Sequence, residues 1–272
     1  MKVKEYFPSF LQSFRLNRRD QGYFFENKNS LDVIVSLTAI ESRLNNIHLV
    51  LKSIWDNADI PKLIVLNLHP RFKNNLPPTL SELQGPYFEI YFTELDCPHA
   101  KLVPSLKRFP DDYIISCDDD LLYQKNWLKL LFEAHLKDPK AIITNQSRII
   151  SYDDAQNILP YTQWRTSYDT SVQSDALLPI GSSGTLYPPA SLYNEVLNEK
   201  LFLKLCPKAD DLWFKMMSFL NKTKSILAEN RAKPALPIIG SQQISLSSTN
   251  IKEDKNRVQW LALSKHFKVN RL

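Results

Sequence analysis

Three consecutive aspartates, Asp118, Asp119 and Asp120, are the residues of this chain best suited to chemistry. They follow the apolar run 113–117, whose β-branched and aromatic residues predict a buried strand that presents the carboxylates where it ends. Adjacent carboxylates repel each other and burial desolvates them, so a cation or a set of donors must compensate the cluster. A divalent metal with oxygen ligands is the simplest compensation. A second interpretation stays open, in which Asp119 or Asp120 caps a helix that begins near Gln124.

A second acid pair, Asp210 and Asp211, stands at the start of a predicted helix. The apolar face of that helix consists of Leu212, Phe214, Met217 and Leu220. Acidic residues in a first turn interact favourably with the helix dipole. This structural explanation accounts well for one aspartate and less well for two.

Residues 147–190 combine polar, aromatic and glycine-containing stretches in an irregular pattern. Trp164 and three nearby tyrosines could stack on the apolar face of a sugar ring, or could simply pack against the domain. Gly181 and Gly184 are two of only five glycines and flank Ser182 and Ser183. A glycine pair lets the backbone approach a ligand closely, although a bulge or a turn uses the same residues.

Short apolar runs alternate with helical patterns through the first half of the chain. The predicted strands are 31–37, 62–68, 88–92, 112–117 and 141–144, with a strand-like 236–239 near the end. The predicted helices include 47–55, 127–136, a segment from about residue 190, and a final helix from Asp254 or Asn256 to Phe267. This alternation predicts an α/β domain with a mostly parallel central sheet, right-handed crossovers and helices on both faces. Ligands then bind at the carboxyl ends of the strands, where the aspartate triplet falls.

Bulk composition narrows the class of protein. The 34 Lys+Arg against 29 Asp+Glu give a formal charge of +5, which suits an anionic substrate or an anionic membrane surface. No long block of like charge occurs, so we expect no nucleic-acid partner. Three unevenly spaced cysteines indicate a reducing compartment. The absence of a long apolar run and of a signal-peptide core predicts a cytoplasmic protein.

Residues 1–30 predict an amphipathic helical segment. Phe7, Phe10, Leu11 and Phe14 recur at helical spacing, and basic residues occupy the other faces. Such a helix can lie on a membrane surface as a peripheral contact at the inner face of the cytoplasmic membrane. It can equally pack on the domain, and its short apolar face favours this second interpretation.

Four features in order carry a resemblance to a known family: the strand and turn 33–38 (VIVSLT), the triplet 118–120, the loop 181–189 (GSSGTLYPP), and the helix opening 209–211 (ADD). Over roughly residues 31–220 the chain resembles GT-A-fold, Rossmann-like glycosyltransferases. It is most similar to family-2-like enzymes of bacterial surface polysaccharide synthesis, including galactofuranosyltransferase domains. The resemblance implies a catalytic domain over 31–232, with a nucleotide-sugar half at 31–146 and an acceptor half at 147–232. The remaining 233–272 form a tail whose helix packs on the domain.

The resemblance also implies roles for single residues. Thr38, Glu41 and Arg43 would line the nucleotide base and ribose, and Lys101 would lie near the nucleotide. Asp118 and Asp120 match the Asp-x-Asp motif: Asp120 would bind Mn²⁺ or Mg²⁺, while Asp118 would contact the ribose or the metal, with Asp119 beside the nucleotide-sugar. Asp211 matches the catalytic base, and Asp210 would position the acceptor. The sugar or acceptor contacts would come from Trp164, Ser182, Ser183, Gly184 and Tyr187.

The activity implied is metal-dependent, inverting transfer of a hexose, with galactose or galactofuranose as examples, from a UDP-sugar. The acceptor would be a glycan or a lipid-linked sugar of O-antigen, capsule or lipooligosaccharide. The Gln/Arg-x-x-Arg-Trp signature of processive members is absent, so a polymerising synthase is not expected. A nucleotidyltransferase is the alternative enzyme, but the turn 38–43 lacks the glycine-rich phosphate loop that it would need. A non-catalytic carbohydrate-binding or scaffolding domain is the alternative outside enzymes.

Overall fold

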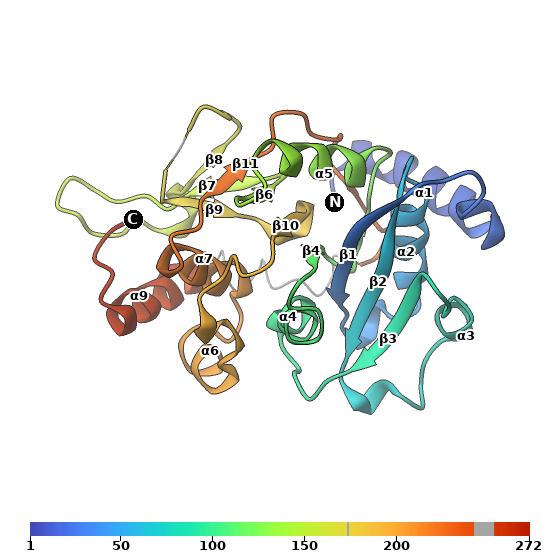
Figure 1. Ribbon diagram of the computed structural model, residues 1–272, viewed down its shortest axis with the longest axis horizontal. Helices are drawn as coiled ribbons and strands as arrows, with labels where there is room; N and C mark the ends of the chain where they lie inside the picture. The colour runs from blue at the N-terminus through green and yellow to red at the C-terminus, as the bar shows by residue number, and fades with distance from the viewer. Residues whose placement is uncertain (173, 242–252) are drawn as a thin grey trace.

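A seven-stranded sheet forms the centre of the computed structural model, which describes residues 1–172, 174–241 and 253–272 (Figure 1). The strand order is β11-β6-β10-β4-β1-β2-β3. The strands are β1 (Ser30–Thr38), β2 (Ile60–Leu68), β3 (Phe88–Phe92), β4 (Tyr113–Ser116), β6 (Ile142–Thr144), β10 (Thr185–Tyr187) and β11 (Ser225–Leu227). All neighbours pair in parallel except β10, which is antiparallel to both β4 and β6. The α/β class with a mostly parallel sheet is therefore confirmed.

Helices cover both faces of the sheet because successive residues of the buried strands point to opposite sides. Val33 and Val35 belong to one hydrophobic core together with α2 and α5, whereas Ile34 belongs to a second core with α4, α6, α7 and α9. The helices are α1 (Val3–Asn17), α2 (Ile47–Trp55), α3 (Pro78–Ser81), α4 (Val103–Arg108), α5 (Trp127–Lys137), α6 (Glu199–Leu205), α7 (Asp210–Leu220) and α9 (Lys255–Phe267). None of the helices in the described part of the chain is long and apolar enough to cross a membrane.

One edge of the sheet gathers the segments that the sequence singled out. β1 and β4 run in parallel with Ser36 opposite Ser116, so both strands end at this edge. β10 runs the other way and begins here, with Thr185 opposite Ser116. The triplet that follows β4 and the loop that precedes β10 must therefore lie side by side.

Two sequence-based predictions fail in the second half of the chain. The segment 147–178 was expected to be irregular, yet it contains the antiparallel strands β7 (Ser147–Ile149), β8 (Arg165–Ser167) and β9 (Leu177–Pro179). β7 and β8 lack a continuous apolar run like the one that marked the equally short β6, and Pro179 interrupts the run at β9. The helix expected from about residue 190 begins only at α6, since Ala190 has a positive φ of 54° directly after two prolines.

Both terminal segments pack next to the triplet. The strand β5 (Leu121–Leu122) follows Asp120 directly and pairs with β12 (Leu236–Pro237) from the tail. The helix α1 contacts β5, β12 and α2. The final helix α9 packs on α6 and α7, as the expected tail helix should.

Candidate active site

Lys101 connects the two acid motifs. Its Nζ lies 2.6 Å from Asp118 Oδ1, as a hydrogen bond, and 3.1 Å from Asp210 Oδ2, as an ion pair without hydrogen-bond geometry. Asp118 follows β4, whereas Asp210 is the first residue of α7. The fold thus brings residues distant in sequence to one point, and we call Lys101, Asp118, Asp210 and Asp211 the carboxylate–lysine centre.

The backbone of Lys101 is held from the sheet. Lys101 ends the short 3₁₀ helix Pro98–Lys101, and its carbonyl oxygen accepts a hydrogen bond of 2.5 Å from Ser36 Oγ on β1. Asn67 Nδ2 donates to the same Ser36 oxygen at 3.0 Å. Burial opposes the charge of this lysine, but Asp118, Asp210 and Asp211 outweigh burial and raise the pKa of Lys101 well above 10.5. The ammonium group is therefore a permanent cation.

Asp211 is the acid of the centre whose protonation is most perturbed. Burial and the neighbouring Asp210 raise the pKa of its carboxyl above 3.8, although Lys101 opposes this shift. Its Oδ1 accepts a hydrogen bond of 3.1 Å from the backbone N–H of Gly181. A carboxylate with a raised pKa is a better proton acceptor near neutral pH than an ordinary aspartate.

Gly181 lies at the site, where the sequence predicted either a close backbone approach to a ligand or a simple turn. A Cβ atom placed on it would lie 2.9 Å from Asp211 Oδ1 and 3.6 Å from Lys101 Nζ. Only glycine therefore lets the loop backbone approach the centre this closely. The scarcity of glycine in the chain and the Gly-Ser-Ser-Gly pattern were the signals available for it.

Arg43 compensates the other two carboxylates of the triplet. Its Nη1 contacts Asp119 Oδ1, and its Nη2 lies 2.8 Å from Asp120 Oδ2. Asp119 Oδ2 also accepts the backbone N–H of Ile40 at 3.3 Å. Burial raises the pKa of Asp119, and Arg43 offsets part of that shift. Arginine and lysine thus place positive charge beside all three carboxylates of the triplet.

The alternative role of the triplet as a helix cap is wrong. The helix α5 begins at Trp127, and the residue in its N-cap position is Asn126. The strand β5 separates Asp120 from that helix. The acids therefore lie where the strand ends for reasons other than capping.

The donor types of the triplet fit Mn²⁺ or Mg²⁺, which prefer carboxylate oxygens. No group of three or more His, Cys, Asp or Glu side chains is arranged to hold a metal within residues 1–172, 174–241 and 253–272. Magnesium in transferase sites is commonly held by only one or two carboxylates together with substrate phosphates. Two carboxylates of the triplet fit this kind of metal site. The side chain of Asp118 is 30% exposed, and Asp120 would bind the metal in place of its present partner Arg43.

Tyr123 ties the end of β4 to the glycine loop. Its hydroxyl oxygen accepts the backbone N–H of Asp118 at 2.9 Å and its O–H donates to Ser182 O at 2.8 Å. No pattern in the sequence marked this residue beyond its apolar surroundings. Because it bonds to both segments, Tyr123 fixes the position of Asp118 relative to the loop.

The rest of the loop is held by α5. Trp127 Nε1 donates to Ser183 O at 2.8 Å, while Ser183 Oγ donates to Gln146 Oε1 at 2.6 Å. Gly184 has a φ of 99°, and a Cβ atom there would lie 2.6 Å from the Trp127 ring. Gly184 is thus required by packing, and Ser182 and Ser183 lie beside the centre.

The remaining predicted residues lie at the end of β1, in the exposed turn after it, or in the buried interior. Thr38 donates to Asn67 O at 2.8 Å at the end of β1, and Glu41 is exposed in the following turn. Trp164 is only 1% exposed and donates to Leu159 O, so no face of its ring is open to a sugar. Tyr187 is likewise buried against Phe214.

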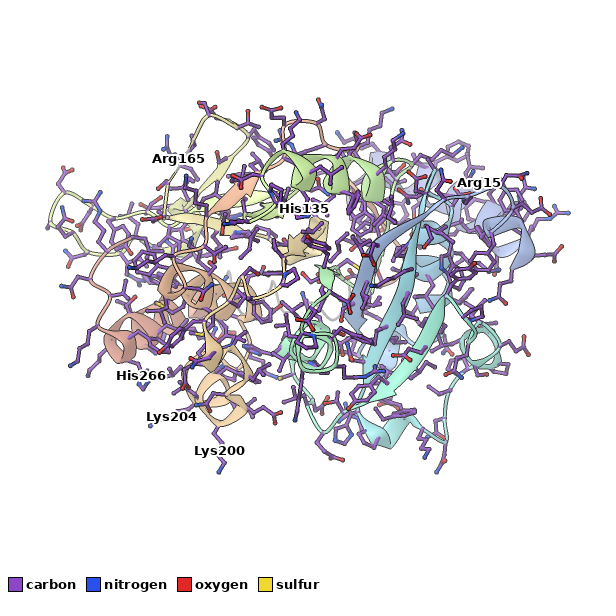
Figure 2. The ribbon with its side chains drawn as sticks, viewed as in Figure 1. Arg15, His135, Arg165, Lys200, Lys204 and His266 are labelled. Atoms are coloured by element: carbon purple, nitrogen blue, oxygen red, sulfur yellow. The ribbon has the colours of Figure 1, made fainter. Side chains whose placement is uncertain are left out.

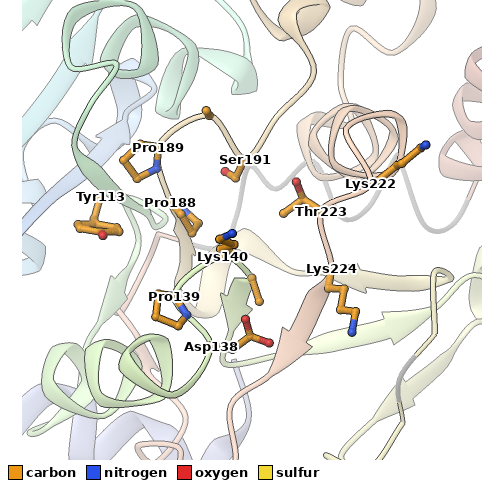
Figure 3. Close-up of a pocket in the computed structure, with 12 residues that line it drawn as sticks. Tyr113, Asp138, Pro139, Lys140, Pro188, Pro189, Ser191, Lys222, Thr223 and Lys224 are labelled. Atoms are coloured by element: carbon orange, nitrogen blue, oxygen red, sulfur yellow. The ribbon is translucent and has the colours of Figure 1, made fainter.

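Two cavities lie away from the centre. A cavity of about 630 Å³ opens at the start of β4, β6 and β11, which is the opposite edge of the sheet (Figure 3). Lys140, Ser191 and Thr223 line it, but none of the predicted site residues does. A second cavity is lined by His266, which lies on α9 at the opposite end of the molecule from Arg15 of α1 (Figure 2).

Three solved structures are similar to this chain. The 4-diphosphocytidyl-2C-methyl-D-erythritol synthase of Anaerococcus prevotii matches with 11% identity over 88% of this chain and 98% of its own, at a TM-score of 0.47. CMP:2-keto-3-deoxy-manno-octonic acid synthetase in complex with CTP matches with 12% identity over 75% and 91%, at 0.39. TarS of S. aureus in complex with UDP matches with 13% identity over 74% and 59%, at 0.46.

Neither a protein-family model nor a curated protein sequence matches the chain. At TM-scores below 0.5 the structural matches carry no argument about the reaction. The function is therefore argued from the carboxylate–lysine centre itself.

Proposed function

We propose that this protein is a GT-A-type glycosyltransferase that moves a hexose from a UDP-sugar to a hydroxyl group of a glycan or lipid-linked acceptor. The observation that carries the proposal is the contact of Lys101 with both Asp118 and Asp210, which joins the two acid motifs at the carboxyl edge of a parallel sheet. One motif faces the donor and the other faces the acceptor in this proposal. Such a division suits a reaction that needs a charged leaving group and a proton acceptor together.

On the acceptor side, Asp211 is the proposed general base. The acceptor hydroxyl oxygen forms a bond to the anomeric carbon while the bond from that carbon to the diphosphate oxygen breaks. The hydroxyl proton passes to Asp211, and the bonding electrons leave with UDP. A single displacement of this kind inverts the anomeric centre. The N–H of Gly181 orients the carboxylate of Asp211. Burial and the neighbouring Asp210 together keep the pKa of that carboxylate raised.

On the donor side, the leaving diphosphate gains negative charge as the sugar bond breaks. Lys101 is a permanent cation at this edge, and Arg43 is a second one beside the triplet. Preorganised cations stabilise such charge without reorganisation during the reaction. A Mn²⁺ or Mg²⁺ ion on Asp118 and Asp120 would add Lewis-acid stabilisation of the same diphosphate.

The finer assignments also belong to this proposal. Thr38, Glu41 and Asp119 would contact the nucleotide, while Ser182, Ser183 and Gly184 would face the transferred sugar or the acceptor. Galactose or galactofuranose is the proposed sugar, and O-antigen, capsule or lipooligosaccharide is the proposed destination.

The Asp211→Asn variant tests the proposal. Asparagine keeps an oxygen for the Gly181 N–H but cannot accept a proton, so transfer should fall by about a hundredfold or more while UDP binding persists. Release of UDP from a panel of UDP-sugars with glycan acceptors is the measurement. Asp154→Asn, at an exposed surface position, is the matched control and should behave as the wild type.

Two outcomes would contradict the proposal. The first is unchanged turnover in Asp211→Asn. The second is release of pyrophosphate from a nucleoside triphosphate and a sugar phosphate, with no reaction of any UDP-sugar, since this would identify a nucleotidyltransferase.

A further inference from the structure

The first helix exposes a continuous apolar face. Val3, Phe7, Phe10 and Phe14 are 90%, 70%, 56% and 51% exposed, and their spacing of four, three and four residues places them on one side of α1. The Phe10 and Phe14 rings lie 6.3 Å apart between centroids. A row of four large exposed apolar side chains on one helix is far from the scattered exposure that soluble proteins usually show.

The opposite face of α1 is already docked. Leu16 is fully buried, Ser9 Oγ donates to Pro237 O at 2.7 Å, and Gln12 Nε2 lies 3.4 Å from Tyr123 O. Figure 1 shows α1 at the periphery of the molecule, beside α2. The exposed row is therefore not the face by which α1 packs on the domain, because the opposite face of the helix makes those contacts.

Cations border the exposed row. Lys2, Lys4 and Arg18 are exposed, and the Arg18 guanidinium lies 5.3 Å from the centre of the Phe14 ring. The only acid of the helix, Glu5, is partly buried and bonds to the backbone N–H of Lys2. Aromatic side chains bordered by lysine and arginine match the interface of an anionic bilayer, where rings enter the acyl boundary and cations meet phosphates.

A second copy of this chain fits the face less well. Two identical α1 faces brought together would place the same cations opposite one another, and like charges in contact destabilise an interface. An anionic lipid surface supplies the opposite charge instead. The observations thus favour a membrane over a dimer.

We propose that α1 docks the protein on the surface of an anionic lipid membrane through Val3, Phe7, Phe10 and Phe14. The helix contacts β5 and β12, the two strands next to Asp120, so docking would hold the carboxylate–lysine centre in a fixed relation to the membrane. This inference goes beyond the proposed reaction and does not depend on it, since membrane binding needs neither donor nor acceptor.

Vesicle co-sedimentation of the full chain tests the proposal. The probes are vesicles of phosphatidylcholine and phosphatidylglycerol in equal parts, and vesicles of phosphatidylcholine alone. The wild type should bind the anionic vesicles, and binding should weaken as salt screens the cations. The Phe7→Gln/Phe10→Gln variant should bind at least about tenfold less, because the apolar area that enters the bilayer is lost.

A matched control comes from α9. Val258 and Leu261 are similarly exposed apolar residues on that helix, so Val258→Gln/Leu261→Gln should bind as the wild type does. Thermal unfolding should give nearly the same Tm for both variants and the wild type, because all four side chains are at least half exposed.

Three results would overturn the proposal. The first is failure of the wild type to bind anionic vesicles. The second is binding by Phe7→Gln/Phe10→Gln that equals that of the wild type. The third is a wild-type dimer in sedimentation velocity that becomes a monomer in this variant. The last result would assign the face to a second copy of the chain.

Discussion

Lys101 is the residue on which the electrostatics of the site depend. It is buried, and its charge is maintained by Asp118, Asp210 and Asp211. Burial first and the neighbouring Asp210 second raise the pKa of Asp211, and the single lysine among three carboxylates offsets only part of that shift. The centre is thus set to accept a proton at Asp211 and to keep a cation at Lys101.

The raised pKa of Asp211 predicts a stability effect. Between 3.8 and the raised pKa the folded protein binds more protons than the unfolded chain, so this group's contribution to stability is lost as the pH rises through that window. At pH 7 the folded protein therefore holds a proton on this carboxyl that the unfolded chain does not, and the uptake of that proton costs stability. Asp211→Asn should have a higher Tm than the wild type at pH 7, and the difference should shrink as the pH falls towards 4.

Thermal unfolding across this pH range provides the measurement. Asp154→Asn should show no such gain at any pH, because its side chain is exposed. A lower Tm for Asp211→Asn at pH 7 would mean that Lys101 outweighs burial at this position.

The sequence predicted single residues unevenly. Both acid motifs were recognised, since consecutive aspartates at a strand end and a helix start are visible in a pattern. The bonds of Arg43 to Asp119 and Asp120 were not, because a contact between separate turns depends on how the strands pair. Tyr123 was missed for the same reason.

At the scale of elements, the loop before β10 brings its backbone to the acids of α7. The 3₁₀ turn Gly181–Ser183 presents the Gly181 N–H to Asp211, while Trp127 of α5 holds the other end of the loop. The glycine loop and α7, which both come from the second half of the chain, thus meet the end of β4, which comes from the first half.

Gly181→Ala should disturb this arrangement without unfolding the protein. The new methyl group would lie 2.9 Å from Asp211 Oδ1 and push that carboxylate aside by a few tenths of an ångström. Misplacement of a catalytic group should lower kcat about tenfold to a hundredfold.

Steady-state kinetics and thermal unfolding test this together. Gly85→Ala is the control, since its methyl group would meet no atom within 4 Å. Full activity in Gly181→Ala would show that the position of Asp211 does not matter to the reaction.

The helix α7 also carries a buried cation, Lys215, that the proposed reaction does not use. Burial lowers the pKa of its ammonium group to about 8, and Asp175 offsets only part of this. Between pH 8 and 10.5 the unfolded chain binds more protons than the folded protein, so stability should rise with pH there. Lys215→Met should stabilise the fold at pH 7 by roughly 1–3 kcal/mol.

Denaturant unfolding at several pH values measures the gain, which should shrink as the pH approaches 10.5. Lys204→Met on α6 is the control, because Lys204 is exposed. A destabilised Lys215→Met at pH 7 would contradict the expected cost of burying this charge.

Strands with a continuous apolar run were predictable, whether long like β1 or as short as β6. The strands β1, β2 and β3 have five to nine residues and were predicted within two residues at each end. The three-residue strands β7, β8 and β9 were not, since their pairing comes from tertiary packing. Residues 147–178 were consequently the least accurately predicted part of the chain.

At the scale of the molecule, one edge of the sheet carries the proposed chemistry, and α1 packs on β5 and β12, the strand pair that follows the aspartate triplet. The fold class followed from alternating strands and helices, and the structure confirms it. The reaction is a separate matter, because α/β folds of this kind host many activities. The site's charges, not its fold, must decide the activity.

Calorimetric titration of UDP, with and without Mn²⁺, tests whether the carboxylate–lysine centre binds the donor of a metal-dependent glycosyltransferase. UDP should bind to the wild type, and Mn²⁺ should tighten the binding. Asp118→Asn should remove the effect of the metal, while Asp154→Asn should keep it. If neither UDP nor another nucleoside diphosphate binds more tightly with the metal, the carboxylate–lysine centre is not the donor site of a metal-dependent glycosyltransferase.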